Sequence, residues 1–269
     1  MVTKKGLLMS RMSRCWQGML AGWCLSLCAN AEYGLNMPYG VTPTSHKIYD
    51  LHMLIFAICC VIAVGVFGVL FYSVVAFRKR PNVKAQQFHD NLWVEIAWTV
   101  IPLILVIIMM IPTVSVMVDL NDASRPSMNI KVTGIQWKWQ YDYLEEGIGF
   151  YSNLSTTPAQ IRGEAPKGPH YLLEVDKPLV VPIHTKIRLL FTSNDVNHSW
   201  WVPDLGVKKD CIPGYINDAW MKIDKPGTYR GQCTELCGMQ HGYMPIVVEA
   251  VSEEDYARWV AQQKQSKRK

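Results

Sequence analysis

The stretch GQCTELCGMQHGYMP, which runs from Gly231 to Pro245, places Cys233, Cys237, His241 and Met244 within twelve residues. Their spacings of four, four and three residues would place all four side chains on one face of a helix. Gly238, Gly242 and Pro245 disfavour that helix, because glycine is costly inside a helix and proline breaks it. The stretch therefore predicts a loop that brings several metal-binding side chains to one point.

The sequence around this loop is typical of a β-rich domain. Short runs rich in β-branched and aromatic residues are separated by prolines and glycines, for example MNIKVTGIQWKWQYDY (128–143), LVVPIHTKIRLLFTS (179–193) and MPIVVEAV (244–251). This pattern predicts a small antiparallel sandwich or barrel over residues 119–251. Over 252–269, Ser252 is a suitable N-cap and Asp255 follows three residues later, which predicts a short helix and then a basic tail.

Two apolar runs precede the β-rich region. The run 51–77 has 27 residues without a fixed charge, and the run 92–118 is equally long with a single charge, Glu95. Each exceeds the roughly 20 residues that a membrane-spanning helix needs. The loop between them (78–91) contains four basic residues, which predicts that it is cytoplasmic. The segment 32–50 and the region after residue 118 would then face the outer side.

The first 31 residues have the layout of a secretory signal. Basic residues are followed by a short apolar stretch and by Ala29-Asn30-Ala31. This order predicts a signal peptide that is cleaved after Ala31. The alternative is an uncleaved membrane anchor.

The charge distribution excludes a nucleic-acid-binding protein. The whole chain has a formal charge of +5, but residues 119–263 contain 18 acidic and 14 basic residues, a net charge of −4. The basic excess lies in the N-terminal segment, in the loop between the apolar runs and in the tail. Nucleic-acid binding would need that excess on a folded face.

Two spans alone provide too little polar surface for a transporter or channel, so a larger membrane partner is predicted. Glu95 supports this prediction, because an ionisable group at membrane depth usually faces protein or water. The alternative is that Glu95 lies at the membrane interface.

The loop residues indicate a metal site. Cysteine, histidine and methionine in one loop are typical of electron-transfer copper, which usually takes its other histidine from an earlier strand. His198 is the best candidate, since strand-like sequence surrounds it. Two thiolates can each bridge two metal ions, so Cys233 and Cys237 would accommodate a copper pair. Two alternatives remain: a tetrahedral zinc site made by the same cysteines and histidines, in which Met244 has no role, and a disulfide between the cysteines.

Four stretches resemble one family. The run CTELCGMQHGYM (233–244) closely resembles the binuclear copper loop of cytochrome c oxidase subunit II, and HSWWVPDLGVKKDCIPG (198–214) resembles the segment that carries its first ligand. GIQWKWQYDY (134–143) is similar to the aromatic stretch of that family, and EIAWTVIP (95–102) is similar to its second membrane span. Together the stretches are spread over most of the chain after residue 50.

The resemblance implies a two-helix membrane hairpin followed by an all-β, cupredoxin-like Greek-key domain. It also implies a binuclear copper A centre with six ligands: His198, Cys233, the backbone carbonyl of Glu235, Cys237, His241 and Met244. In the family, the side chain at the Glu235 position also reaches a magnesium ion at the boundary with subunit I. Trp137 matches the residue at which the electron from cytochrome c enters. Glu95 matches a carboxylate at the mouth of a proton path.

The resemblance further implies partners and a location. The chain would pass electrons to haem in subunit I, where oxygen is reduced to water with proton pumping, and subunit III would complete the assembly. It would lie in a bacterial inner membrane, with the copper domain on the periplasmic side. The chain has no Cys-x-x-Cys-His sequence, so the fused form with its own haem is excluded. Cys211 and Tyr215 depart from the family pattern, so contacts near that turn could differ.

Three other functions compete with this interpretation. A quinol oxidase subunit would lack the residues that bind copper. This chain has a suitable residue at each of the six ligand positions. The copper domain of a nitrous oxide reductase would belong to a soluble protein with a large catalytic domain. A copper chaperone would expose its thiolates, whereas apolar residues flank this loop. A last expectation concerns Trp137 and Trp139, whose strand spacing predicts that they share a face with Tyr141 and Tyr143.

Overall fold

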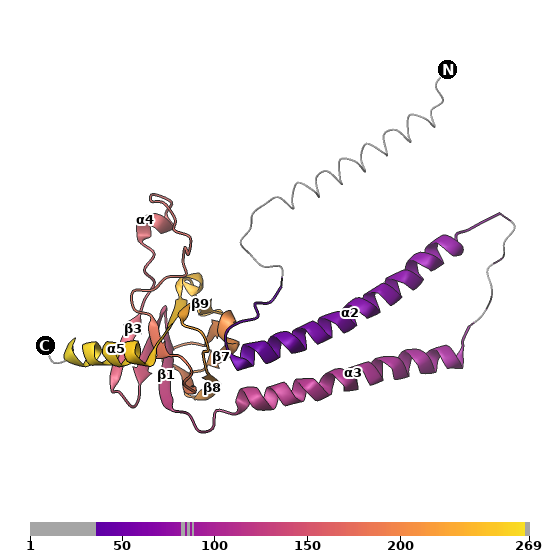
Figure 1. Ribbon diagram of the computed structural model, residues 1–269. Coiled ribbons are helices and arrows are strands. Elements are labelled where there is room, and N and C mark those ends of the chain that lie inside the picture. Colours follow the sequence, from indigo (N-terminus) through magenta and orange to yellow (C-terminus); the bar gives the residue numbers. More distant parts are fainter. Residues whose placement is uncertain (1–35, 82–83, 85–86, 88, 267–269) are drawn as a thin grey trace, which may run out of the picture. The chain divides into compact units, whose positions relative to one another are not determined.

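The computed structural model describes residues 36–81, 84, 87 and 89–266, and within them two long helices precede a β-domain (Figure 1). The predicted signal peptide, 1–31, lies outside the described residues. The helices are α2 (Pro43–Ala76), α3 (Leu92–Asn121), α4 (Pro158–Ile161) and α5 (Glu253–Ser266), with short 3-10 turns η1 (Pro203–Leu205) and η2 (His241–Tyr243). The strands are β1 (Met128–Ile135), β2 (Lys138–Tyr143), β3 (Ile148–Ser152), β4 (Leu179–Pro182), β5 (Ile187–Ser193), β6 (His198–Val202), β7 (Val207–Cys211), β8 (Asn217–Met221), β9 (Gly227–Cys233) and β10 (Pro245–Val251).

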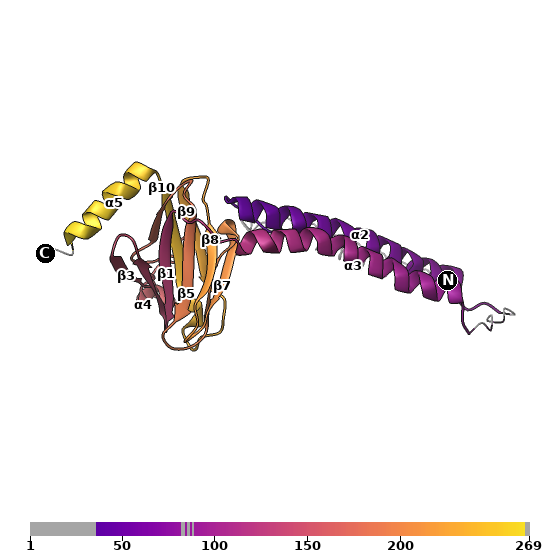
Figure 2. The same cartoon turned by 90° about the horizontal axis from the view of Figure 1, so that it is seen from below.

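Helices α2 and α3 run side by side, and each is long and apolar enough to cross a membrane (Figures 1 and 2). Helix α2 begins at Pro43, before the apolar run that starts at residue 51. Its start is set by a capping box, in which the Thr42 hydroxyl accepts the Ser45 N–H and the Ser45 hydroxyl accepts the Thr42 N–H. Proline suits the first helical position because its missing N–H would be unpaired there. Helix α3 begins at Leu92, the first residue of the second apolar run, and the Asn91 side chain caps it.

The start of α2 is tied to the β-domain by buried polar contacts. The Thr42 hydroxyl donates to the Leu205 carbonyl (2.8 Å), and the Val41 N–H donates to the Asp204 carbonyl (2.9 Å). Thr42, Thr44 and Ser45 are almost fully buried. At the end of α3, the Trp220 indole N–H donates to the Asp119 carbonyl (2.9 Å). The hairpin therefore joins the β-domain through the N-terminal end of α2 and the C-terminal end of α3.

The β-domain is a sandwich of two five-stranded sheets, which Figure 2 shows as two layers of strands. One sheet has the order β3-β2-β1-β5-β8 and the other β4-β10-β9-β6-β7. Most neighbours are antiparallel, as predicted, but β1 pairs with β5 and β4 pairs with β10 in parallel. Alternation along one strand does not determine the direction of its neighbour, so the parallel pairs were not predictable from it.

The core lies between the two sheets and is rich in aromatic residues. Trp139, Tyr141 and Tyr143 of β2 point inward and are at most 1 % exposed, and Trp200 of β6 is fully buried. Trp137 differs from the prediction, because it belongs to the two-residue turn that joins β1 to β2 and is only half-buried. Ile135 pairs directly with Lys138, so the strand alternation stops before Trp137. The aromatic stretch is thus core over 139–143 and turn at Trp137.

Two smaller features complete the domain. Helix α5 begins after Ser252, whose hydroxyl accepts the Asp255 N–H (3.1 Å), so the predicted cap is confirmed. Trp259 of α5 packs on Tyr143.

The segment between β3 and β4 carries α4 as a projecting arm (Figure 1). The arm is closed at its base by hydrogen bonds from Asn153 to the Asp176 carboxylate (2.7 and 2.9 Å).

Candidate metal centre

Side chains from two separate elements meet at one end of the sandwich. The ligand atoms of His198, Cys233 and Cys237 all lie within 4.8 Å of one another, and all three residues are buried. The Nδ1 atom of His241 lies 3.5 Å from Cys237 Sγ, so a fourth donor adjoins this group. Among the residues that the structure describes, no other group of three histidine, cysteine or acidic side chains is arranged for a metal ion.

The strands place His198 and Cys233 next to each other. His198 is the first residue of β6 and Cys233 is the last residue of β9. These strands are antiparallel neighbours, with Trp200 paired opposite Cys233. As a result, His198 Nδ1 lies 3.9 Å from Cys233 Sγ. His198 is fully buried, so its ring has little freedom to leave this position.

The stretch after β9 is a loop, as its glycines and proline predicted. Gly238 has φ of +121°, a conformation that side-chain-bearing residues rarely adopt. The Cys233 N–H donates to the Met244 carbonyl (3.1 Å), which closes the loop at its two ends. Cys237 lies inside the loop and His241 begins the turn η2. Because the loop is closed in this way, Cys233 Sγ and Cys237 Sγ lie 3.9 Å apart.

A disulfide between Cys233 and Cys237 is not present. Their sulfurs are 3.9 Å apart, whereas a disulfide bond is about 2.05 Å long. Both are free thiols. Donor chemistry and separation fit a metal held between the two thiolates, with one imidazole next to each.

The pKa values of the two thiols are driven apart. Burial alone would raise the pKa of Cys233, but hydrogen bonds from His198 and from the Ser199 and Glu235 backbone lower it overall. Burial and the neighbouring Cys233 thiolate raise the pKa of Cys237. The Cys233 thiol therefore loses its proton more readily than the Cys237 thiol, and both must be deprotonated when they bind a metal.

Asp195 is a functional residue that sequence reasoning missed. One carboxylate oxygen, Oδ1, lies 2.8 Å from His198 Nε2, on the side of the ring opposite Nδ1. Burial disfavours the charge of Asp195, but hydrogen bonds from the Gln136 and Val196 N–H groups and from His198 lower its pKa overall. A carboxylate on the outer nitrogen keeps the proton there and leaves the inner nitrogen free to bind metal. Aspartate three residues before histidine is too common a pattern to have signalled this role.

Gly134 is a second residue that the sequence reading missed. A Cβ atom at this position would lie 2.7 Å from Cδ2 and 2.8 Å from Cγ of His198, so the imidazole ring packs directly on the backbone of β1. A glycine inside a strand often marks such a close approach, and this signal could have been used.

We expect Gly134→Ala to push the His198 ring out of place and to lower metal affinity about tenfold or more, since such overpacking typically costs about 1–3 kcal/mol. Metal titration of the full chain in detergent measures the effect. Gly168→Ala is the matched control, because a Cβ there meets nothing within 4 Å. Equal affinity in the two variants would contradict the close approach.

Trp137 directly contacts the loop between β9 and β10 (234–244), which carries Cys237 and His241. Its indole N–H donates to the Cys237 carbonyl (3.3 Å), and a Cβ at Gly238 would lie 3.1 Å from the ring. The half-exposed indole is therefore hydrogen-bonded directly to the backbone of Cys237, a candidate metal ligand.

The other predicted site residues lie around or away from the donors. Met244 is buried at the end of the loop, and the Glu235 carbonyl lies 3.4 Å from Cys233 Sγ while its side chain is exposed. Glu95 lies in the first turn of α3. The rest of that helix, roughly 40 Å at 1.5 Å per residue, separates it from the β-domain. Cys211 is buried at the end of β7, paired opposite His198, and Tyr215 is exposed.

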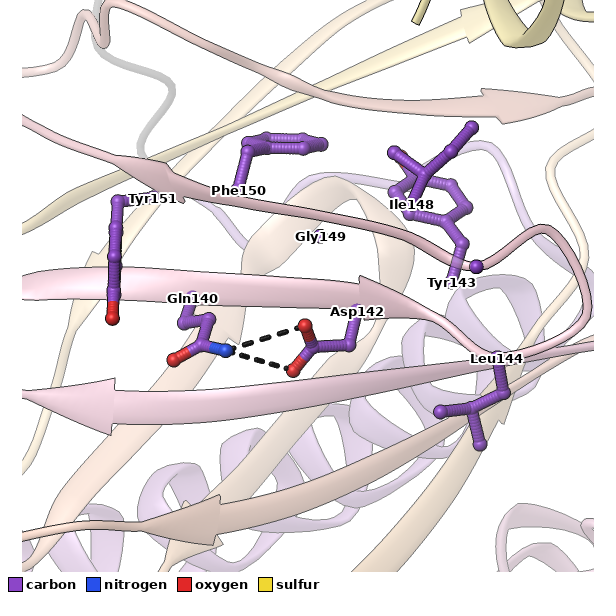
Figure 3. A pocket seen from close by; sticks show the side chains of 9 residues that line it. Gln140, Asp142, Tyr143, Leu144, Ile148, Gly149, Phe150 and Tyr151 are labelled. Atoms are coloured by element: carbon purple, nitrogen blue, oxygen red, sulfur yellow. Dashed lines mark hydrogen bonds between the residues drawn. The ribbon is translucent and has the colours of Figure 1, made fainter. Parts of the chain in front are cut away.

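A hollow on the outer face of β2 and β3 contains none of the predicted donors. Gln140, Asp142, Leu144 and Tyr151 point to its side of the strands (Figure 3). The Gln140 amide donates to both oxygens of the Asp142 carboxylate (3.2 and 3.1 Å). The hollow is separate from the metal cluster and contributes no ligand to it.

Comparison with known proteins agrees with this geometry. Residues 128–251 match the family described as cytochrome c oxidase subunit II, periplasmic domain, and residues 30–118 match the corresponding transmembrane domain. A probable cytochrome c oxidase subunit 2 of Rickettsia prowazekii is 38 % identical over 221 residues, covering 82 % of this chain and 69 % of the relative. The chain belongs to the cytochrome c oxidase subunit II family.

Further members of the subunit II family are equally similar. Cytochrome c oxidase subunit 2 of Cyanidium caldarium is 37 % identical over 225 residues, covering 81 % of this chain and 86 % of the relative. A crystal structure of the periplasmic domain of cytochrome oxidase subunit II of Bradyrhizobium japonicum is 38 % identical. The alignment of the two structures covers 54 % of this chain and 98 % of the Bradyrhizobium japonicum chain, with a TM-score of 0.48.

Membership of the subunit II family confirms the predicted resemblance and the predicted fold class. The family is a component of haem-copper oxidases and implies copper, which the His, Cys and Cys cluster fits. The transmembrane-domain match and the two apolar helices indicate insertion in a membrane.

Proposed function

We propose that this chain receives electrons from cytochrome c and relays them, through a binuclear copper A centre, to haem in subunit I of a cytochrome c oxidase. Oxygen would be reduced to water in subunit I, coupled to proton pumping. When bound, the copper pair would supply a one-electron carrier whose charge is shared over two ions. This chain would carry no haem.

The arrangement of the four donors carries the proposal. Two thiols lie 3.9 Å apart, and an imidazole nitrogen lies within 3.9 Å of each. Cys233 and Cys237 would bridge the copper ions, with His198 and His241 as terminal ligands. The Glu235 carbonyl, close to Cys233 Sγ, and Met244 would supply weak contacts. A tetrahedral zinc site would use the same four donors, but zinc does not carry electrons.

Trp137 would be the residue at which the electron enters. Its hydrogen bond to the Cys237 carbonyl supports this role, because no side chain intervenes between the indole and a ligand residue. A hollow lined by Trp137, Leu154, Ile161 and Tyr243 adjoins the indole and would receive part of the donor surface.

The remaining roles concern the partner subunits. The exposed carboxylate of Glu235 lies on the copper loop, where it could reach a magnesium ion shared with subunit I. Glu95, in the first turn of α3, would open a proton path that continues into subunit I. Subunit III would complete the membrane assembly.

The proposed location is a bacterial inner membrane. The basic loop 78–91 would face the cytoplasm, and the copper domain, 119–251, with the tail 252–269 would face the periplasm. The segment 1–31 would be removed as a signal peptide. Residues 51–76 of the first span lie within α2 and the whole second span, 92–118, lies within α3, which supports this division.

We expect the reduction of the copper-loaded chain by cytochrome c to slow as salt is added. Residues 119–263, the copper domain and C-terminal helix without the basic tail, have a net charge of −4, so this part of the chain should attract a basic donor through charges that salt screens. Stopped-flow mixing of reduced cytochrome c with the full chain in detergent, at increasing ionic strength, measures this rate constant.

An uncharged small-molecule reductant serves as the control for this experiment, since its rate constant should not change with salt. A rate constant with cytochrome c that is equally independent of salt would indicate an apolar or tethered donor. A chain that cytochrome c does not reduce at any ionic strength would contradict the proposed relay.

A further inference from the structure

The turn between β1 and β2 contacts both of the segments that carry metal donors. Gln136, the first residue of this turn, uses its backbone and its side chain in different directions. Its backbone N–H donates to Asp195 Oδ2 (2.7 Å), in the connection before β6. Its side-chain amide, Nε2, donates to the Cys237 carbonyl (2.8 Å), in the copper loop. One residue thus connects the two halves of the donor set.

The backbone contact acts on His198 through Asp195. Because the Gln136 N–H holds one carboxylate oxygen, the other oxygen stays 2.8 Å from His198 Nε2. The ring then keeps Nδ1 directed at Cys233. A partner of this kind sets both the tautomer and the orientation of a metal-binding imidazole.

The side-chain contact acts on the copper loop. The Cys237 carbonyl accepts from Gln136 Nε2 (2.8 Å) and more weakly from the Trp137 indole (3.3 Å). A Cβ at Gly238, the next residue, would lie 3.1 Å from Gln136 Nε2, so the loop backbone packs closely on the amide. The shorter of the two hydrogen bonds that hold Cys237 in the loop therefore comes from Gln136.

We propose that Gln136 is a positioning residue for the copper centre, which holds Cys237 through its amide and His198 through Asp195. The inference rests on the proposed function, because it concerns copper binding by the same donors. Gln136 is itself exposed, and its side chain has no part in the core. Its replacement should therefore alter the site without unfolding the domain.

The test compares Gln136→Leu with Gln140→Leu in the copper-loaded full chain. Gln140 lies on the adjoining strand and its amide bonds only to Asp142, away from the donors, so it is a matched control (Figure 3). We expect both variants to bind copper with wild-type stoichiometry. Gln136→Leu should release copper to a chelator about fivefold faster, the effect of losing one hydrogen bond of typical strength.

Two spectroscopic readouts separate positioning from general stability. The hyperfine pattern in electron paramagnetic resonance and the reduction potential of the centre should both change in Gln136→Leu and stay unchanged in Gln140→Leu. If the two variants match the wild type in release, spectrum and potential, the inference is wrong. If the wild-type chain binds no copper pair, the proposed function itself fails, which is a distinct result.

Discussion

Replacing Cys237 with serine should abolish the binuclear copper centre. A hydroxyl is a poor replacement for a bridging thiolate, so the remaining donors could hold at most one copper ion through Cys233 and His198. The shared-electron spectrum should disappear, and oxidase activity of the assembled complex should fall to background. Copper analysis and electron paramagnetic resonance of the purified full chain measure the change at the site directly.

The control for this variant is a cysteine that is buried but makes no proposed metal contact. Cys211 is fully buried at the end of β7, directly across from His198 in the strand register. Cys211→Ala should therefore retain two copper ions and the wild-type spectrum. A Cys237→Ser chain that kept both ions would show that the bridging assignment is wrong.

Replacing Trp137 with phenylalanine should slow the reduction of the copper centre by cytochrome c by at least an order of magnitude. The substitution removes the indole N–H that donates to the Cys237 carbonyl and enlarges the gap between the surface and the ligand backbone. Copper content should stay at the wild-type level, because the Cys237 carbonyl keeps its shorter hydrogen bond from Gln136. Stopped-flow reduction and copper analysis of the same sample give the two quantities.

An exposed aromatic residue outside the turn provides the comparison for Trp137. Tyr151 on β3 is 47 % exposed and contacts Lys138, and it makes no hydrogen bond to the copper loop. Tyr151→Leu should leave the rate constant unchanged. Loss of copper from Trp137→Phe would mark the residue as structural, and a wild-type rate constant with copper retained would mean that the electron enters elsewhere.

Much of the site was predictable because its residues are close in sequence. The glycines and proline of the loop predicted its irregular backbone, and two cysteines with a histidine and a methionine predicted a metal. His198 was predictable from its strand-like surroundings, since a donor at the start of a strand can reach a neighbouring loop. The structure brings His198, Cys233, Cys237 and His241 together as expected.

The contacts that support the donors were not predictable, since they join segments far apart in the chain. Asp195 contacts His198 with one carboxylate oxygen, while its other oxygen accepts a hydrogen bond from the Gln136 N–H, which comes 59 residues earlier in the chain. Gly134 matters because β1 lies under the His198 ring, which depends on how the two sheets pack. Trp137 was placed on a strand face because alternation continues through 139–143, and nothing in that pattern reveals where the strand begins.

The membrane hairpin was likewise predictable only in part. Composition predicted two apolar spans, which α2 and α3 contain, but hydropathy gave no sign that α2 extends back to Pro43. The extension depends on the Thr42 cap and on its bond to Leu205, a residue of the β-domain. The length of this helix is thus set partly by a tertiary contact.

The most direct test of the account is metal analysis of the full chain in detergent, combined with electron paramagnetic resonance of its oxidised form. We predict two copper ions per chain and a hyperfine pattern from one electron shared equally over two copper nuclei. A single zinc ion with no paramagnetic signal would contradict the account, because the same four donors would then form a structural site that carries no electrons.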